Sequence, residues 1–259
     1  MWDVFLDAIF SLINWLYGFT HDWGMAIILI TIIFRIIIYP ITRKQYKSTY
    51  AMQKMQPQMK AIKEKYADDQ QRQQEETMKL YQEAKFNPLS GCLPMVLQMP
   101  IFIALYQVLL NLSGHIEKVT GSLPENVSVT FYQIIPDLTL SPSTVFFDQG
   151  ILAVIPYIIL VLLFGVSILV PMFLNKNADK QTKLMSIVMA AVMLWFGWTV
   201  PAGVLLYWDV SSIIGIGQQT ISQRLLKKKD ELKEADEIKP IKVDVERKEH
   251  KSRPTKKNK

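Results

Sequence analysis

Apolar and polar residues alternate in long blocks along the 259-residue chain. Five blocks are apolar enough to be spans, at about residues 23–41, 92–112, 151–174, 184–200 and 204–221. Their lengths fall near the roughly 17–25 residues with which a helix crosses a bilayer. A helix also satisfies its own backbone polar groups inside lipid. The pattern therefore predicts an all-α, polytopic membrane protein with five transmembrane helices.

The first 22 residues have a two-sided pattern instead. Apolar residues recur at helical spacing, at Trp2, Phe5, Leu6, Ile9, Phe10, Ile13, Leu16 and Tyr17. The opposite side carries Asp3, Asp7, Ser11 and Asn14, and Trp15 falls off the apolar stripe. Such a helix, with Trp and Tyr in it, is typical of a segment that lies in the membrane interface. We therefore expect an interfacial amphipathic helix and turn over 1–22, with an ordinary packed helix as the alternative.

Residues 42–86 are strongly polar and hold ten Lys and Arg residues. They predict a cytoplasmic helical hairpin, with helices over about 42–66 and 70–85. A narrow apolar seam runs along the first helix, interrupted by Pro57, and consists of Met52, Met55, Met59, Ile62 and Tyr66. Because methionine adapts to varied surfaces, Met52, Met55 and Met59 are candidates for docking a partner. The alternative is that the two helices close on each other along this seam.

Breakers and charge organise the rest of the chain. The turn-forming cluster 87–91 opens the segment 87–224, which contains spans two to five and a predicted extracellular loop over 113–150. Residues 225–259 are rich in charge and poor in apolar residues. That composition predicts a basic, disordered cytoplasmic tail.

Lysine and arginine are distributed unequally among the polar segments. Ten lie in 42–86, three in 175–183 and fourteen from Arg224 onward, whereas the 113–150 loop has one and residues 1–34 have none. Basic loops are retained on the cytoplasmic side of a membrane. The distribution predicts a multi-pass cell-membrane protein with its N-terminus outside and its C-terminus in the cytoplasm.

Two charged residues fall inside the predicted spans. Arg35 lies in the first, where a charge at the membrane centre costs roughly 2.5–3.5 kcal/mol on insertion scales, and Asp209 lies in the fifth. At about 1.5 Å of rise per residue, Arg35 is about 16 Å and Asp209 about 12 Å from the outer ends of their helices. Their similar depth leads to the hypothesis that the two side chains pair, directly or through water, and form a gate. The alternative is that Asp209 faces another polar group or water at the outer face.

Motifs of catalysis and metal binding are missing from the sequence. The three histidines, His21, His115 and His250, lie outside the spans, and there is one cysteine. Neither an HExxH motif nor a Walker A loop is present. Serines inside the spans, at positions 167, 186, 211 and 212, are typical of helix packing. We therefore expect no catalytic residues, no metal, no cofactor and no enzymatic activity.

Three motifs resemble those of the YidC/Oxa/Alb family of membrane protein insertases, over residues 1–225. The first is Asn87-Pro88-Leu89-Ser90-Gly91-Cys92-Leu93-Pro94-Met95, with Gln98-Met99-Pro100-Ile101-Phe102 and Leu105-Tyr106. The second is Pro201-Ala202-Gly203 with Leu206-Tyr207-Trp208, and the third is Arg35 followed by Tyr39-Pro40 and the charged hairpin. The N-terminal sequence shows neither a lipoprotein leader nor a large extracellular domain, so a short bacterial form is expected.

The resemblance implies an insertase and chaperone with a hydrated groove in the membrane, open to the cytoplasm and lipid. Arg35 matches the family's groove arginine, and the residues expected in the groove are Arg35, Thr31, Gln98, Gln107, Trp208 and Asp209. The implied partners are nascent membrane proteins, the lipid bilayer, the signal recognition machinery and the Sec translocon, with the ribosome contacted by the basic tail; DNA is not among them. The alternative is a small transporter or channel that uses Arg35 as an anion site, although no internal repeat is found.

Overall fold

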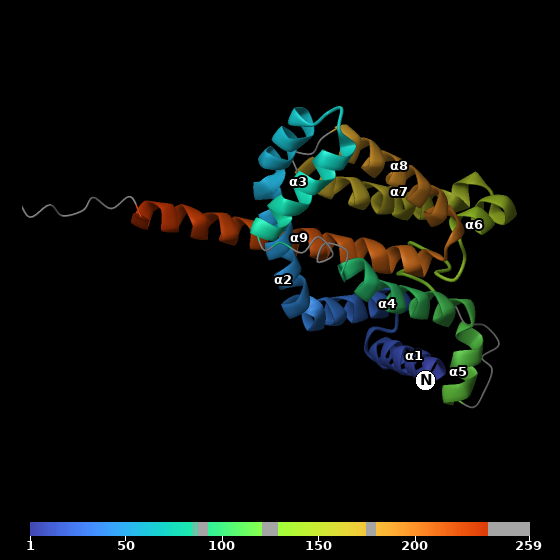
Figure 1. Ribbon diagram of the computed structural model, residues 1–259. Helices are drawn as coiled ribbons and strands as arrows, with labels where there is room; N and C mark the ends of the chain where they lie inside the picture. Colours follow the sequence, from blue (N-terminus) through green and yellow to red (C-terminus); the bar gives the residue numbers. More distant parts are fainter. Residues whose placement is uncertain (85, 87–92, 121–128, 175–179, 238–259) are drawn as a thin grey trace, which may run out of the picture.

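The computed structural model describes residues 1–84, 86, 93–120, 129–174 and 180–237. In these ranges the regular elements are helices, and the single β-bridge joins Phe131 to Ile135. The helices are α1 (Trp2–Thr20), α2 (Trp23–Lys65), α3 (Gln70–Glu83), α4 (Leu93–Leu110), α5 (Leu112–Thr120), α6 (Pro142–Gln149), α7 (Ile151–Leu174), α8 (Lys180–Thr199) and α9 (Ala202–Glu237) (Figure 1). The predicted all-α class is confirmed.

Among the residues that the structure describes, two helices are long and apolar enough to cross a membrane, α2 and the Ile151–Val170 part of α7. A third span results if Gln98–Leu110 and Leu112–Lys118 count as one, although their axes are bent by 83°. The Lys183–Thr199 part of α8 is apolar but shorter. The count of five transmembrane helices therefore remains a prediction.

Helix α1 buries much of its predicted apolar stripe against the rest of the protein. Its buried residues are Leu6, Ile9, Phe10, Ile13 and Leu16. Trp15 and Phe19 are exposed and form an edge-to-face pair with ring centroids 4.8 Å apart. Trp2, at the start of the stripe, is exposed as well. These three rings can meet the membrane interface, and the interfacial position of α1 stays a prediction.

Helix α2 continues through the expected end of the first span. Asp22 caps its first turn by accepting a hydrogen bond from the backbone N–H of Met25 at 2.8 Å. Pro40 and Pro57 both lie inside the helix, and its last residue is Lys65. A proline removes one intrahelical hydrogen bond, so it weakens a helix locally without having to end it. The prediction that one helix ends near residue 41 and a separate helix begins at residue 42 is therefore wrong.

Helix α3 lies beside the second half of α2. The Tyr81 hydroxyl is 3.8 Å from the sulfur of Met59, and the Gln73 side chain donates to the carbonyl of Lys63 at 3.4 Å. Along the methionine seam Met55 is buried, while Met52 and Met59 are half-buried. The seam is thus partly covered by the chain itself, and a cytoplasmic docking hairpin remains a prediction.

The described residues of the predicted long loop over 113–150 include helices, and the prediction of a loop is corrected for them. These helices are α5 and α6, and α6 begins at Pro142 after the capping residue Ser141. Leu138 and Leu140 lie just before α6 in the chain. Their carbonyls accept hydrogen bonds from the backbone N–H groups of Gly203 and Ala202, at 2.8 and 2.9 Å. These bonds close the end of the bundle at which α2 and α9 begin.

Helix α9 extends beyond the expected fifth span. It is helical to Glu237, so the prediction of a disordered tail is wrong for residues 225–237. Asp230 explains part of the difference, because it accepts hydrogen bonds from Tyr50, at 3.2 Å, and from Lys54 of α2. Residues 238–259 and the cluster 87–91 lie outside the described residues.

The α2–α9 interface is the most extensive helix pairing in the described chain. Helix α7 packs on one side of α9 and α8 packs on α7, while α1 and α4 lie on the side of α2 (Figure 1). One buried apolar cluster joins these helices, with Ile27, Leu105, Phe164 and Leu205 among its members. The candidate site lies where α2, α4, α7, α8 and α9 come together.

Candidate functional site

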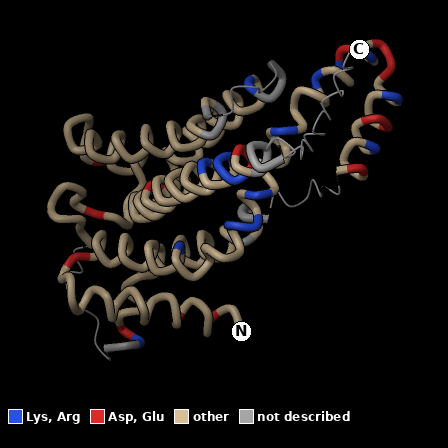
Figure 2. Tube along the Cα trace, turned by 90° about the vertical axis from the view of Figure 1, so that its left-hand side faces the viewer, with Lys and Arg blue, Asp and Glu red and all other residues tan. Residues whose placement is uncertain are grey.

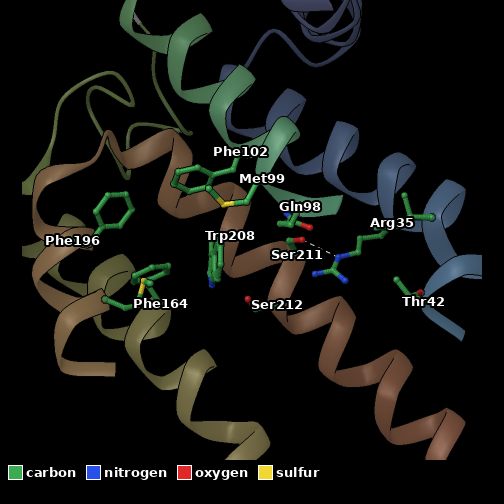
Figure 3. A pocket seen from close by; sticks show the side chains of 12 residues that line it. Arg35, Thr42, Gln98, Met99, Phe102, Phe164, Phe196, Trp208, Ser211 and Ser212 are labelled. Carbon is green, nitrogen blue, oxygen red and sulfur yellow. Dashed lines mark hydrogen bonds between the residues drawn. The ribbon is translucent and has the colours of Figure 1, made fainter. Parts of the chain in front are cut away.

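A cavity of about 370 Å³ lies between five helices at the centre of the bundle. It is lined by Arg35, Ile38 and Thr42 of α2, Gln98, Met99 and Phe102 of α4, Phe164 of α7, Met193 and Phe196 of α8, and Trp208, Ser211 and Ser212 of α9 (Figure 3). The lining has a polar wall around Arg35 and an apolar wall of aromatic and methionine side chains. The cavity can therefore contact a polar part and an apolar part of one bound molecule at the same time.

Arg35 reaches from α2 toward α9 (Figure 3). Its Nε–H donates to the hydroxyl of Ser211 at 2.8 Å. Hydrogen bonds to a charged group stabilise by about 1.5–3 kcal/mol, which offsets much of the cost of a charge in the membrane. Ser211 is 3% exposed, so this bond is sheltered from bulk water.

Two further polar side chains are held by the protein itself. The Thr42 hydroxyl donates to the carbonyl of Tyr39 at 3.1 Å, and the Gln98 side-chain amide donates to the Tyr207 hydroxyl. Tyr207 is buried on α9, so this contact joins α4 to α9 beside the cavity. The polar wall is thus built from partly satisfied groups on three helices.

Trp208 separates the polar wall from the apolar one. Its ring meets Phe164 at 5.3 Å and Phe102 at 6.0 Å between centroids, both in edge-to-face geometry. Phe102 also lies 6.1 Å from Phe196. Pairs of this kind add about 0.5–1.5 kcal/mol beyond the burial of area, so the apolar wall is firmly packed.

Three of the six residues predicted for the groove line this cavity: Arg35, Gln98 and Trp208. The other three lie elsewhere. Thr31 is fully buried, and its hydroxyl donates to the carbonyl of Ile27 at 2.6 Å. Gln107 faces α1, where it accepts a hydrogen bond from the Trp2 indole at 2.7 Å.

Asp209 is buried outside the cavity lining, and its pairing with Arg35 is not found. Neither carboxylate oxygen has a hydrogen-bond partner among the described residues, and the side chain is 3% exposed. Asp209 lies two positions before Ser211, the residue that holds Arg35. Residues two apart point to nearly opposite sides of a helix. The direct Arg35–Asp209 pair is therefore wrong, and with it the gate that depended on it.

Several cavity residues were absent from the sequence prediction. Serines such as Ser211 and Ser212 are typical of helix packing, and Phe164 and Phe196 belong to none of the three family motifs. Phe102 belongs to the first family motif, which gave it no role in the groove. Helical spacing was a usable signal, because positions 208, 211, 212 and 215 share one side of α9. In the described part of the chain, no group of three or more His, Cys, Asp and Glu side chains could hold a metal ion.

Comparisons with known proteins agree with this architecture. Residues 15–230 match the model of the 60Kd inner membrane protein family. A membrane protein insertase YidC of Haemophilus influenzae (strain PittEE) is 39% identical over 236 residues, and those of Mannheimia succiniciproducens and Syntrophobacter fumaroxidans are 40% and 35% identical over 232 and 221 residues. The matches cover 88%, 88% and 84% of this chain but 38% of each relative.

A solved structure is also similar. A crystal structure described as an active YidC insertase with the first transmembrane domain resolved superposes with a TM-score of 0.61 and 28% sequence identity, over 86% of this chain and 46% of the other. Together with the apolar helices, these relatives indicate a bacterial membrane protein. The resemblance to the insertase family is confirmed, and the chain belongs to the 60Kd inner membrane protein family, that of YidC.

Proposed function

We propose that the protein is an insertase and chaperone that receives hydrophobic proteins beside Arg35 and releases them into the lipid bilayer. The observation that carries the proposal is the two-sided cavity, with Arg35, Gln98 and Ser211 on one wall and aromatic rings on the other. The polar wall would receive the hydrophilic tail of a substrate. The apolar wall would guide its hydrophobic span toward lipid.

The drive comes from the substrate itself. Moving an apolar span from water into lipid is favourable by roughly 25 cal/mol per Å² of apolar surface. The obstacle is the polar tail, whose passage through hydrocarbon is costly. A hydrated groove at Arg35 lowers that cost, so no bond has to be hydrolysed. Nascent membrane proteins and the bilayer are the proposed partners, with the signal recognition machinery, the Sec translocon and the ribosome as further ones.

Arg35 acts in this proposal by its charge. Arg35→Lys keeps a cation and should retain most insertion. Arg35→Ala should slow the insertion of a substrate with an acidic tail by about tenfold, the lower range for loss of a charge-assisted hydrogen bond. A substrate with a neutral tail should be affected much less.

The test uses the full chain in phospholipid vesicles and a single-span substrate, with protease protection of its tail as the readout. The tail carries either Asp or Asn at the same positions. Arg43→Ala is the matched control, because Arg43 is an exposed arginine of the same helix outside the cavity. Equal losses for the two tails would contradict the role of the charge. Anion flux through the vesicles without insertion would support a channel instead.

A further inference from the structure

Two small residues of α9, one helical turn apart, lie against the side chain of Arg35. Ser211 accepts the hydrogen bond from Nε at 2.8 Å. Gly215 lies beside the other end of the same side chain. A Cβ atom at position 215 would lie 2.9 Å from Nη1 and 3.2 Å from both Cζ and Nη2. Only a residue without a side chain leaves this space free.

The hydrogen bond to Ser211 determines which edge of the guanidinium remains available. A guanidinium binds a carboxylate with two parallel hydrogen bonds, either through Nε and one terminal nitrogen or through the two terminal nitrogens. Ser211 occupies Nε, and the terminal nitrogens are directed away from its hydroxyl (Figure 3). The end-on edge, Nη1 and Nη2, is therefore the one that a ligand can approach, and Gly215 keeps it uncovered.

We propose that Ser211 and Gly215 are positioning residues that fix the Arg35 guanidinium so that a substrate carboxylate binds end-on at Nη1 and Nη2. This inference rests on the proposed function and deepens it. In this arrangement the carboxylate is bound by Arg35 and not by either of these two residues. Ser211 orients the guanidinium through Nε, and Gly215 provides the space in which its terminal nitrogens stay accessible.

The structure offers closely matched variants. Gly215→Ala places a methyl group against a flexible side-chain end, so the fold can persist while the guanidinium is displaced or covered. Gly217→Ala makes the same change two residues later on the same helix, where a Cβ would meet nothing within 4 Å. Both variants gain the same intrinsic helix propensity, so the difference between them reports the effect on Arg35.

The first experiment measures insertion of the acidic-tail and neutral-tail substrates in vesicles. Ser211→Ala and Gly215→Ala keep the charge of Arg35 and should each lower the acidic-to-neutral rate ratio by roughly threefold, less than Arg35→Ala does, whereas Gly217→Ala should leave it unchanged. In an Arg35→Lys background, which has no Nε–H, Ser211→Ala should have no further effect on the ratio. Equal losses for both tails, or an undiminished effect in the Arg35→Lys background, would overturn the proposal.

A second readout does not depend on insertion. Phenylglyoxal modifies the terminal nitrogens of arginine, and peptide mass spectrometry reports the extent at Arg35 alone. Gly215→Ala should slow this modification at least several-fold relative to Gly217→Ala, with Arg43 in each variant as the internal reference. Equal rates at Arg35 would show that Gly215 does not keep this edge open. A further outcome is that the wild-type protein inserts no substrate while the two glycine variants still differ in the modification rate of Arg35. That result would contradict the proposed function but support the positioning of Arg35 by Gly215.

Discussion

Asp209 is a carboxyl group buried in α9 without a described partner. Burying a polar group without a hydrogen bond costs about 1–3 kcal/mol. Asp209→Leu, which keeps the branched arrangement of heavy atoms but replaces the oxygens by larger methyl groups, should therefore raise the midpoint of thermal unfolding in detergent by a few degrees. The acidic-to-neutral insertion ratio should stay unchanged, because Asp209 does not line the cavity.

Asp209→Asn provides the control for Asp209→Leu. It keeps the shape and a polar group, so it should gain less stability than the leucine variant. A lower midpoint for Asp209→Leu, together with a changed insertion ratio, would show that the carboxyl group has a partner or a role in substrate binding.

The depths of Arg35 and Asp209 along their helices could be predicted from the sequence. Depth does not say to which side of its helix each side chain points. The rise per residue places Arg35 and Asp209 at similar depths, which is one condition for pairing. Pairing also requires that the two side chains face each other, which depends on the rotation of about 100° per residue. Arg35 itself was recognisable because a lone charge in an apolar run needs a reason. Ser211 was not, because small polar residues in spans commonly serve helix packing.

At the scale of elements, α3 is the helix with the weakest attachment to the bundle among the helices whose side chains the structure describes in full. It has no buried residue, and its named contacts to α2 are those of Tyr81 and Gln73. Few buried contacts mean a low free energy of local opening. Amide hydrogen exchange should therefore be faster over 70–83 than over the 202–222 part of α9, measured in detergent or nanodiscs.

The α2 segment around Tyr50 and Lys54 serves as an internal comparison for that experiment. It is polar like α3 but is held to α9 through Asp230, so its exchange should be slower than that of α3. Protection of α3 equal to that of α9 would contradict the prediction. The same contact shows why composition misjudged residues 225–237, since a charged segment can stay helical when a neighbouring helix supplies a partner.

For the molecule as a whole, the order of helices was predictable and their extents were less so. Apolar blocks and breakers located the apolar helices, because burial in lipid or in protein demands an apolar sequence. The continuity of α2 through two prolines and the fold of residues 129–150 depend on tertiary contacts. An example is the bond from the Tyr157 hydroxyl to the carbonyl of Asp137 at 2.9 Å, which no local pattern reveals.

Charge is also segregated over the whole molecule, and this predicts its orientation. Lys and Arg gather mainly on the right-hand side in Figure 2, interspersed there with Asp and Glu, while the loops on the left carry Asp and Glu without such a cluster of basic residues. Since basic ends stay in the cytoplasm, α3 should lie inside the cell and α6 outside. Single cysteines at exposed polar positions test this in a Cys92→Ser background. With a membrane-impermeant maleimide, Asp148→Cys should be labelled on intact cells, and Gln74→Cys only after the membrane is opened. Labelling in the reverse order would mean that the charge pattern does not set the topology of this chain.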